Sequence, residues 1–440
     1  MSTQENDSPN VVVILTDQQR WDSVGAYGNP MDVTPHLDAM ADRGTLLRNA
    51  FTPQPVCTPA RACLQTGQYQ NETGVWRNGM ALPADVPTLA SCFEAAGYRT
   101  GYVGKWHLGG SRTNPVPAEH RGGYEHWRAA DAIELTSHPY EGVVFDEDGK
   151  QIPFQGYRVD AMNDLAISYI RESAATDEPF FLFLSHLEPH HQNDMGYPSG
   201  RDRYMAPDGY AERFAEPYIP SDLRDRQGHW YAELPDYYGI CHRIDETVGT
   251  LRATLEDLDI ADETIVLFTS DHGCHFRTRN RSKKASCHEA SIRVPAIIDG
   301  PGFANREVMD LVSLIDLPPT LFDAAGVESP DNIPGHSLLG DESRADVFVQ
   351  ISGTELGRAI RTDRWKYAVR AHEEDAEGMT ATRYVESYLY DLARDPAESN
   401  NLIGRADHQP TADRLRDRLR RRIKSVEGMD VTVEPAQGPA

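Results

Sequence analysis

The sequence predicts an α/β protein with two parts: a large domain built on a buried, mostly parallel sheet, and a smaller C-terminal part built on an antiparallel sheet. The first observation is a set of continuous apolar runs, at residues 11–16, 180–184 and 264–270. Such runs are typical of parallel strands that are covered on both faces. The second is that helix-like segments separate these runs, and the third is a change to short strand-like segments after residues 330–340.

The length of the chain supports this division. A chain of 440 residues is too long for one simple core, and its 39% hydrophobic and 25% charged residues are usual for a globular protein. We therefore expect a disordered N-terminus at 1–10, the main domain at 11–335, an antiparallel-sheet subdomain at 336–428 and a loose tail at 429–440.

The expected elements alternate along the main domain. Helical patterns cover 37–44, 86–97, 159–173, 237–258 and 314–326, and further strands cover 100–104 and 296–299. Of two long segments with little periodicity, 111–157 is expected to form loops or a short hairpin over the site that influence specificity. The other, 192–235, is a polar insertion whose tyrosines and Trp230 could stack on a sugar, although packing of the loop is the first interpretation. The C-terminal part is expected to hold strands at 347–351, 359–361, 366–369 and 384–390 and a basic amphipathic helix at 412–426.

Composition limits the partners and the compartment. A formal net charge of -25 argues against nucleic acid as a partner, so an anionic substrate would need a local cationic pocket. The six cysteines are scattered without a CxxC pair, which fits unpaired thiols in a reducing compartment. No apolar run is long enough for a signal-peptide core or a membrane span. We expect a cytoplasmic protein without membrane contact, or a periplasmic or secreted one if a signal was removed.

Polar side chains follow two of the buried strands directly. Asp17 and Gln18 follow the first run, and Asp271 and His272 follow the run at 264–270. Ligands of open α/β sheets gather at the carboxyl ends of the strands, so these residues are candidates for holding a hard cation. Asp17 could equally cap the next helix.

Further candidates follow the two remaining strands. Lys105 and His107 come after one strand, and His190 comes after another, with His186 and His191 as its competitors. An imidazole is suited to proton transfer near neutral pH. Three histidines this close could instead form a transition-metal site, although no helical ligand spacing supports it.

The stretch Cys57-x-Pro59-x-Arg61 begins a predicted helix, because proline is favoured in the first turn. Unpaired N–H groups and the dipole at a helix N-terminus favour an anion. Arg61 lies four residues after Cys57, on the same helix face. Together these features indicate chemistry on a tetrahedral oxyanion, whereas the short motif alone would fit a structural cysteine beside a surface arginine.

The longer run Cys57-x-Pro59-x-Arg61-x-x-Leu64-x-Thr66-Gly67 resembles the signature of the type I sulfatase family, within the alkaline phosphatase superfamily. The resemblance continues in Gly104-Lys105-Trp106-His107-Leu108-Gly109, in the set Lys284, Glu289, Arg293 and Pro295, and in Leu389-Tyr390-Asp391-Leu392. It covers nearly the whole chain. It implies an alkaline-phosphatase-like fold, in which helices flank a mixed, mostly parallel sheet and a smaller α+β subdomain follows.

The resemblance also implies a sulfuric ester hydrolase in which a formylglycine-generating enzyme oxidises Cys57 to formylglycine. The hydrated aldehyde supplies the nucleophile, and its second hydroxyl permits release of sulfate, which an unmodified thiolate could not do. The implied metal ligands are Asp17, Gln18, Asp271, His272 and the modified residue 57, around Ca²⁺ or, given the imidazole nitrogen, Mn²⁺. The implied catalytic roles are orientation of the hydrate by Arg61, sulfate binding by Lys105, Lys284 and His190, leaving-group protonation by His190, and proton removal by His107.

Two departures keep alternatives open. Many sulfatases carry Asp-Asn where this chain has Asp271-His272, and the combination of Gln18 with His272 resembles phosphonate monoester hydrolases. One alternative is therefore a phosphonate monoester or phosphodiester hydrolase on the same scaffold. Another is a non-catalytic anion-binding protein with an unmodified Cys57. Long loops, aromatic residues and extra cations favour a sulfated carbohydrate as the substrate.

Overall fold

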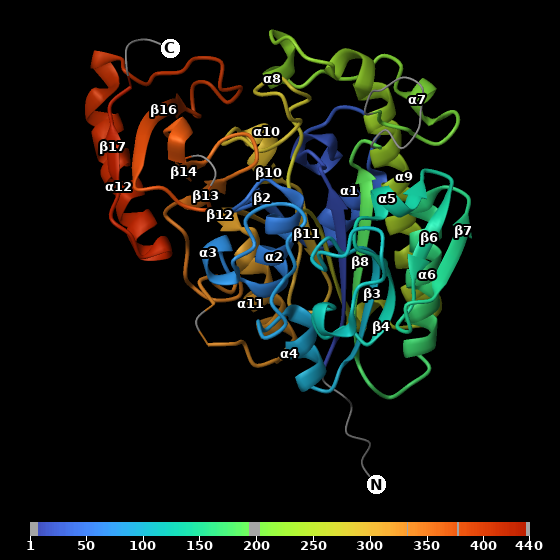
Figure 1. The fold of residues 1–440 in the computed structure, drawn as a ribbon. Helices are drawn as coiled ribbons and strands as arrows, with labels where there is room; N and C mark the ends of the chain where they lie inside the picture. Colours follow the sequence, from blue (N-terminus) through green and yellow to red (C-terminus); the bar gives the residue numbers. More distant parts are fainter. Residues whose placement is uncertain (1–7, 193–202, 332, 376–377, 437–440) are drawn as a thin grey trace.

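A twelve-stranded mixed sheet forms the centre of the molecule, and the described residues are 8–192, 203–331, 333–375 and 378–436 of a computed structural model (Figure 1). Its strand order is β10-β2-β11-β9-β1-β8-β3-β4-β6-β5, with β12 paired to β2 and β7 paired to β6. The parallel centre consists of β9 (Thr264–Ser270), β1 (Asn10–Asp17), β8 (Phe180–Pro189), β3 (Arg99–Lys105) and β4 (His126–Ala130).

Shorter strands extend the sheet on both sides. On the β9 side they are β11 (Ala296–Asp299), β2 (Thr45–Phe51), β10 (Arg293–Val294) and β12 (Arg306–Ser313). On the β4 side they are β6 (Glu141–Phe145), β5 (Ser137–His138) and β7 (Gln151–Gln155). Because β11 runs antiparallel to both β9 and β2, the sheet is mixed, as the resemblance implied.

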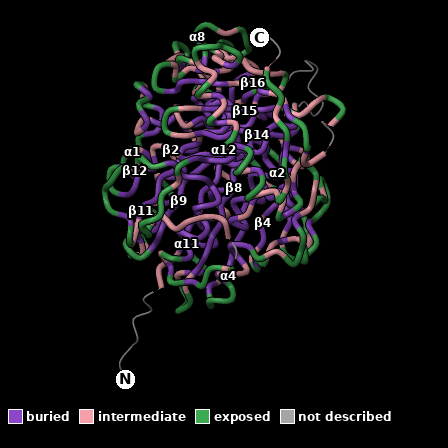
Figure 2. Tube along the Cα trace, turned by 90° about the vertical axis from the view of Figure 1, so that its left-hand side faces the viewer, coloured by how far each residue is buried: buried purple, intermediate pink, exposed green. Residues whose placement is uncertain are grey.

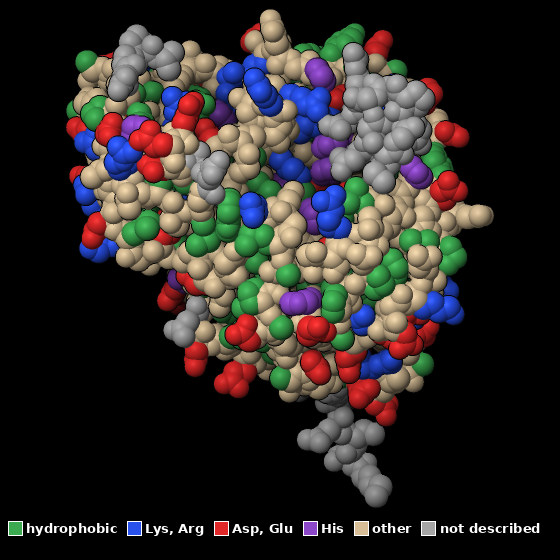
Figure 3. Space-filling view, viewed as in Figure 1, with side chains coloured by type: hydrophobic (Ala, Val, Ile, Leu, Met, Phe, Trp, Pro, Cys, Tyr) green, Lys and Arg blue, Asp and Glu red, His purple; other side chains and the backbone are tan. Residues whose placement is uncertain are grey.

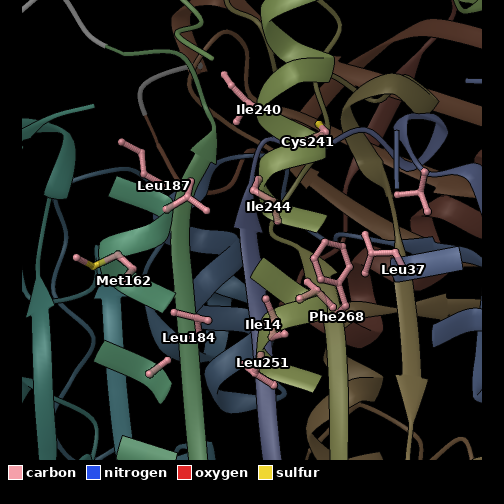
Figure 4. Close-up of a cluster of buried hydrophobic side chains, with 14 of the residues drawn as sticks. Ile14, Leu37, Met162, Leu184, Leu187, Ile240, Cys241, Ile244, Leu251 and Phe268 are labelled. Atoms are coloured by element: carbon pink, nitrogen blue, oxygen red, sulfur yellow. The ribbon is translucent and has the colours of Figure 1, made fainter. Parts of the chain in front are cut away.

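Helices cover both faces of the sheet, and β1 shows why. Its side chains alternate between the faces: Val12 and Ile14 pack into one core, while Val13 and Leu15 pack into the other. The first core receives α1 (Pro35–Arg43), α6 (Arg158–Ser173) and α9 (Trp230–Asp257), and the second receives α2 (Cys57–Thr66), α4 (Leu89–Ala95) and α11 (Leu317–Ala325). Figure 4 shows the first core, where Ile14, Leu184 and Phe268 meet Ile244 and Leu251 of α9.

The C-terminal part forms a second sheet with one long helix (upper left in Figure 1). Its strands are β13 (Val347–Ile351), β14 (Gly357–Arg361), β15 (Trp365–Ala371), β16 (Arg383–Asp391) and β17 (Thr432–Glu434), in that order. The helix α12 (Gln409–Glu427) buries Leu415, Leu419 and Ile423 at four-residue spacing. This arrangement confirms the expected antiparallel sheet with a helix.

Several short helices complete the described chain: α3 (Gln70–Thr73), α5 (Ile133–Thr136), α7 (Tyr210–Arg213), α8 (Ser221–Arg224) and α10 (Glu289–Ile292). Figure 2 shows buried residues through the interior and exposed ones along the surface. Within the described ranges, no helix combines the length and apolar character needed to cross a bilayer.

Three expectations need correction. The segment 111–157 contains the expected hairpin, formed by β6 and β7, but it also contains β4, which joins the main sheet beside β3. The helix expected from residue 237 begins at Trp230 and contains Pro235. The expected loose tail at 429–440 contains β17, which pairs with the free edge of β16. The tail's last four residues and residues 1–7 of the expected disordered N-terminus lie outside the described ranges, while Asn10 already belongs to β1.

Candidate active site

The carboxyl ends of neighbouring strands bring the candidate residues together. Asp17 is the last residue of β1, Lys105 is the last residue of β3, and Asp271 follows β9 directly. These strands stand in the order β9-β1-β8-β3, so their ends lie at one edge of the sheet. Beside Lys105, the backbones of β3 and β8 approach each other closely. A Cβ at Gly104 (φ +103°) would lie 2.0 Å from the Ser185 carbonyl oxygen, so this position requires glycine.

Cys57 occupies the first position of α2 and is only 1% exposed. Its Sγ lies 2.7 Å from Lys284 Nζ, 3.3 Å from His272 Nε2 and 3.5 Å from Asp17 Oδ1. Burial, and then the charge of Asp17, raises the pKa of the thiol to about 12. The unmodified side chain is therefore a neutral thiol near pH 7, a weak nucleophile.

Arg61 contacts both carboxylates of the site. Its Nε donates to Asp271 Oδ2 at 3.1 Å, its Nη2 to Asp17 Oδ2 at 3.2 Å and its Nη1 to Ser185 Oγ at 2.7 Å. The guanidinium is 2% exposed, so these charge-assisted bonds fix it between the strand ends. Arg61, on the same helix face as Cys57, therefore also holds the carboxylates of Asp17 and Asp271 in place.

Lys105 lies between two carboxylates, of which only Asp17 is marked by a pattern in the sequence. Its Nζ lies 2.8 Å from Asp17 Oδ2 and 3.4 Å from Glu134 Oε1. Burial opposes ionisation of Glu134, yet the Lys105 ammonium lowers the pKa of that carboxyl below its usual value. Glu134 belongs to α5, inside the segment expected to form loops, and no motif marks it.

The two strand-end carboxylates titrate differently. Burial opposes ionisation of Asp17, but the positive charges of Lys105 and its neighbours hold the pKa of Asp17 well below its usual range. Burial, together with the negative charge of Asp17, raises the pKa of Asp271 to about 7. Two buried carboxylates this close favour a bound cation, because positive charge between them allows both to ionise.

The donor set around these carboxylates fits a divalent metal. Asp17, Cys57, Asp271 and His272 each offer a ligand atom, and these atoms all lie within 4.8 Å of one another. His272 Nδ1 lies 3.0 Å from the Gly273 carbonyl oxygen, so it donates there and leaves the Nε2 lone pair facing the group. Burial holds the pKa of His272 well below its usual value, which keeps it neutral as a ligand must be.

Gln18 also belongs to this corner of the molecule. Its backbone N–H donates to Asp271 Oδ1 at 3.1 Å, and its side-chain Oε1 lies 3.1 Å from His191 Nδ1. Its buried Nε2 has no partner among the described residues. Exchange of the amide oxygen and nitrogen would let nitrogen donate to His191 and leave oxygen for a cation.

The histidines that the sequence singled out separate into different environments. His190 Nδ1 lies 2.7 Å from the His191 carbonyl oxygen, so its Nε2 is left as the acceptor, and the two rings stack at 4.1 Å. His107 has a left-handed backbone (φ 62°), and its buried Nδ1 has no partner in the described part of the chain. Among the described residues, His186, His190 and His191 do not come together as a metal-ligating group.

Lys284 reaches the site from a loop between β9 and α10. The loop is tied down by a hydrogen bond from Ala285 N–H to the Pro55 carbonyl, 3.1 Å long. The other members of the Lys284 pattern lie elsewhere: Glu289 pairs with Lys366 of the C-terminal sheet at 2.8 Å and with Arg293 at 4.0 Å. Lysine, arginine and histidine side chains gather at a hollow in the upper part of Figure 3, above the strand ends.

Comparisons with known proteins agree with this geometry. The sequence model of the family described as "Sulfatase" matches residues 9–327, and that of "N-sulphoglucosamine sulphohydrolase, C-terminal" matches residues 282–425. An ulvan-active sulfatase of Formosa agariphila is 31% identical over 96% of this chain and 82% of its own length. An N-acetylglucosamine-6-O-sulfatase of Bacteroides thetaiotaomicron is 24% identical over 97% of this chain and 88% of its own.

Solved structures show the same fold. A putative sulfatase yidJ from Bacteroides fragilis superposes with a TM-score of 0.82 at 25% identity, covering 97% of this chain and 98% of its own. The family match spans the whole main sheet and the strand-end site described above. The chain therefore belongs to the sulfatase family of the alkaline phosphatase superfamily and is a sulfuric ester hydrolase.

Proposed function

We propose that this sulfatase releases inorganic sulfate from a sulfated carbohydrate, with residue 57 converted from cysteine to formylglycine and a divalent cation, Ca²⁺ first, held beside it. The observation that carries the proposal is the position of Cys57: its sulfur lies 2.7 Å from Lys284 Nζ and within a group of buried metal-type ligands. In the active enzyme, hydroxyl oxygens of the hydrated formylglycine would occupy the place of this sulfur.

The metal ligands we propose are Asp17, Gln18, Asp271, His272 and residue 57. When bound, the cation supplies positive charge that polarises the sulfate and favours deprotonation of the hydrate. Oxygen ligands favour Ca²⁺, and the His272 nitrogen leaves Mn²⁺ as the second choice. Arg61, which bridges Asp17 and Asp271, holds the carboxylates in place and orients residue 57.

The remaining residues act on the sulfate group. Lys105 is fully buried and the Lys284 side chain is 12% exposed, and both cations would neutralise charge on the sulfate oxygens as the ester bond breaks. His190, whose Nδ1 contacts the His191 carbonyl, would once protonated at Nε2 donate to the sulfate and then to the leaving oxygen. His107 would take the proton from the second hydroxyl of residue 57 so that sulfate can leave.

The proposed substrate class rests on the relatives of this chain. One relative is named for activity on ulvan and another for removal of the 6-O-sulfate of N-acetylglucosamine. In this chain, Lys283 beside Lys284 lies 4.1 Å from the centre of the Tyr204 ring and pairs with Glu233 at 2.8 Å. Both Lys283 and Tyr204 are buried, so this contact supports the loop that carries Lys284 and does not itself reach a substrate.

A peptide mass spectrum across residue 57, from protein co-produced with a formylglycine-generating enzyme, tests the proposal first. The expected product is the aldehyde or its hydrate, in which the side chain has exchanged its thiol for oxygen. Sulfate release from sugar sulfates, aryl sulfates and matched phosphonate monoesters then tests the substrate. An unmodified cysteine would overturn the proposed nucleophile, and faster turnover of phosphonates would overturn the substrate class.

A further inference from the structure

The helix α12 carries a row of arginines that the catalytic site does not use. Arg414, Arg418, Arg421 and Arg422 stand at spacings of i, i+4, i+7 and i+8, which places them on one face of the helix. The buried residues Leu415, Leu419 and Ile423 lie on the neighbouring face, against the C-terminal sheet. Lysines and arginines appear along the left margin of Figure 3, where Figure 1 draws α12.

A surface hollow of about 520 Å³ runs along this arginine face. Its described lining contains the four arginines, Ser425 and a single carboxylate, Asp346. Asp346 accepts from Arg418 and also from Arg422, whose Nε and Nη2 lie 3.0 and 2.8 Å from Oδ1. Because the Asp346 side chain is only 5% exposed, it fixes the two guanidinium groups from below.

Arg414 and Arg421 differ from the other cations of the helix. Both are exposed, and within the described part of the chain neither makes a hydrogen bond or an ion pair. Elsewhere on α12, Arg416 pairs with Asp413, and Lys424 pairs with Asp430. The hollow therefore carries four guanidinium groups against one carboxylate, in a chain whose formal net charge is -25.

We propose that this arginine face is a second, non-catalytic binding site for a sulfated polysaccharide. Planar guanidinium groups bind oxyanions through paired hydrogen bonds, and the two that Asp346 holds lose little freedom on binding. Arg414 and Arg421 are seven residues apart, about 10 Å along the helix axis, so they would contact successive anionic groups of a polymer. The choice of a sulfated carbohydrate as ligand rests on the proposed function of the catalytic site.

The arginine face would retain the polymer while the distant catalytic site acts on it. An acidic protein repels a polyanion over most of its surface, so a local cationic row determines where the chain docks. The net negative charge also disfavours nucleic acid, which we treat as an outcome of the test.

The test measures binding of dextran sulfate to the full-length Cys57→Ala protein, which cannot turn over. The double variant Arg414→Gln/Arg421→Gln should bind about tenfold or more weakly, and the slope of log K against log salt should fall by about two, one for each lost cation. The matched control is Arg420→Gln/Lys424→Gln, which removes two charges from another face of the same helix and should change affinity less than twofold.

Equal losses in the two double variants, or no loss in either, would overturn the proposal. Single-stranded DNA of matched charge binding as tightly as dextran sulfate would overturn the ligand class. The variant Arg414→Lys/Arg421→Lys keeps the charges but not the paired donors, and it should fall between the wild type and the glutamine variant. When the same arginine and lysine substitutions are made in the protein that keeps Cys57, turnover of a small sulfate ester should be unchanged. A protein that releases no sulfate at all would contradict the proposed catalytic function and leave the binding result on dextran sulfate standing.

Discussion

The ammonium group of Lys284 lies 2.7 Å from the sulfur of Cys57, although 227 positions of the sequence separate them. The first residue comes from a loop after β9, and the second begins α2. Cys57 is buried and the Lys284 side chain is 12% exposed, and their contact places a cation at the one atom that modification would change. Residue 57 therefore contacts the Lys284 ammonium only when the chain after β9 has packed beside the start of α2.

Replacing Lys284 by alanine should reduce kcat for sulfate release by about 10²–10³, the usual cost of removing one group that stabilises developing charge. Formylglycine conversion at residue 57, measured by mass spectrometry, should be unchanged. The control is Lys150→Ala, at an exposed turn before β7, which should retain wild-type kinetics. Full activity of Lys284→Ala would exclude this lysine from the sulfate site.

Glu134 is expected to act through Lys105, whose Nζ lies 3.4 Å from its Oε1. Glu134→Gln keeps the shape but removes the charge, so Lys105 would shift toward Asp17, its remaining partner at 2.8 Å. We expect kcat to fall about tenfold with KM little changed, consistent with loss of one charged contact in a buried site. A KM effect alone would instead indicate that Glu134 contacts the substrate.

The sequence predicted most of what the parallel strands hold, and missed what tertiary packing adds. The positions of Asp17, Lys105 and Asp271 at the site were predictable, because the strands before them could be identified in the sequence and the carboxyl ends of such strands carry ligands. Glu134 was not, because a single turn of helix in an irregular segment has no periodicity to mark it. The assigned roles of the site residues stay predictions until they are measured.

Long-range pairing explains the remaining differences in the fold. The strand β4 is five residues long and gains its place only by pairing with β3, and β17 does so by pairing with β16. Neither has enough local pattern to be read from a short window. In α9, Pro235 concealed the true start, because a proline inside a helix removes a backbone N–H donor and in a sequence usually marks a helix boundary.

Removing divalent cations should lower both activity and thermal stability. Without a cation, the buried carboxylates of Asp17 and Asp271 are balanced by the side chains of Arg61, Lys105 and Lys284. A cation at 100 times its Kd adds about 2.7 kcal/mol to the stability of the native state. Unfolding scans in a chelator, followed by addition of Ca²⁺ or Mn²⁺, should show a lower Tm that is restored. The shift should vanish in Asp271→Asn, and a chelator-insensitive Tm would contradict the metal site.

Lys366 should be a major determinant of how firmly the C-terminal sheet is attached. Its fully buried ammonium lies 2.8 Å from Glu289 Oε1 and 2.7 Å from Glu398 Oε1. Lys366→Met would leave two buried carboxylates side by side, and removing one partner of a buried ion pair costs about 3–5 kcal/mol. Urea unfolding should show a loss of this size. Lys424→Met, which breaks an exposed pair with Asp430, should cost less than about 1 kcal/mol.

The stability of the protein should also depend on pH through Asp245 of α9. Its carboxylate accepts the N–H groups of His36 and Leu37 at 3.0 and 2.7 Å and so caps α1. Burial raises its pKa to about 7, above the value of about 3.9 in an unfolded chain. Between about pH 3.9 and about pH 7, the native state therefore binds more protons at this group than the unfolded state does. The contribution of Asp245 to stability falls as the pH rises through this range and is lost above about 7.

Asp245→Asn removes this titration and keeps one acceptor for α1. The Tm of the variant minus that of the wild type should therefore increase from pH 5 to pH 8, by an amount that corresponds to about 1–3 kcal/mol at 1.4 kcal/mol per pKa unit. Comparing the two proteins cancels the pH dependence of the other groups. Asp42→Asn, at an exposed position of α1, should show a constant difference. A constant difference for Asp245→Asn as well would mean that the carboxylate is already ionised in the native state at pH 5.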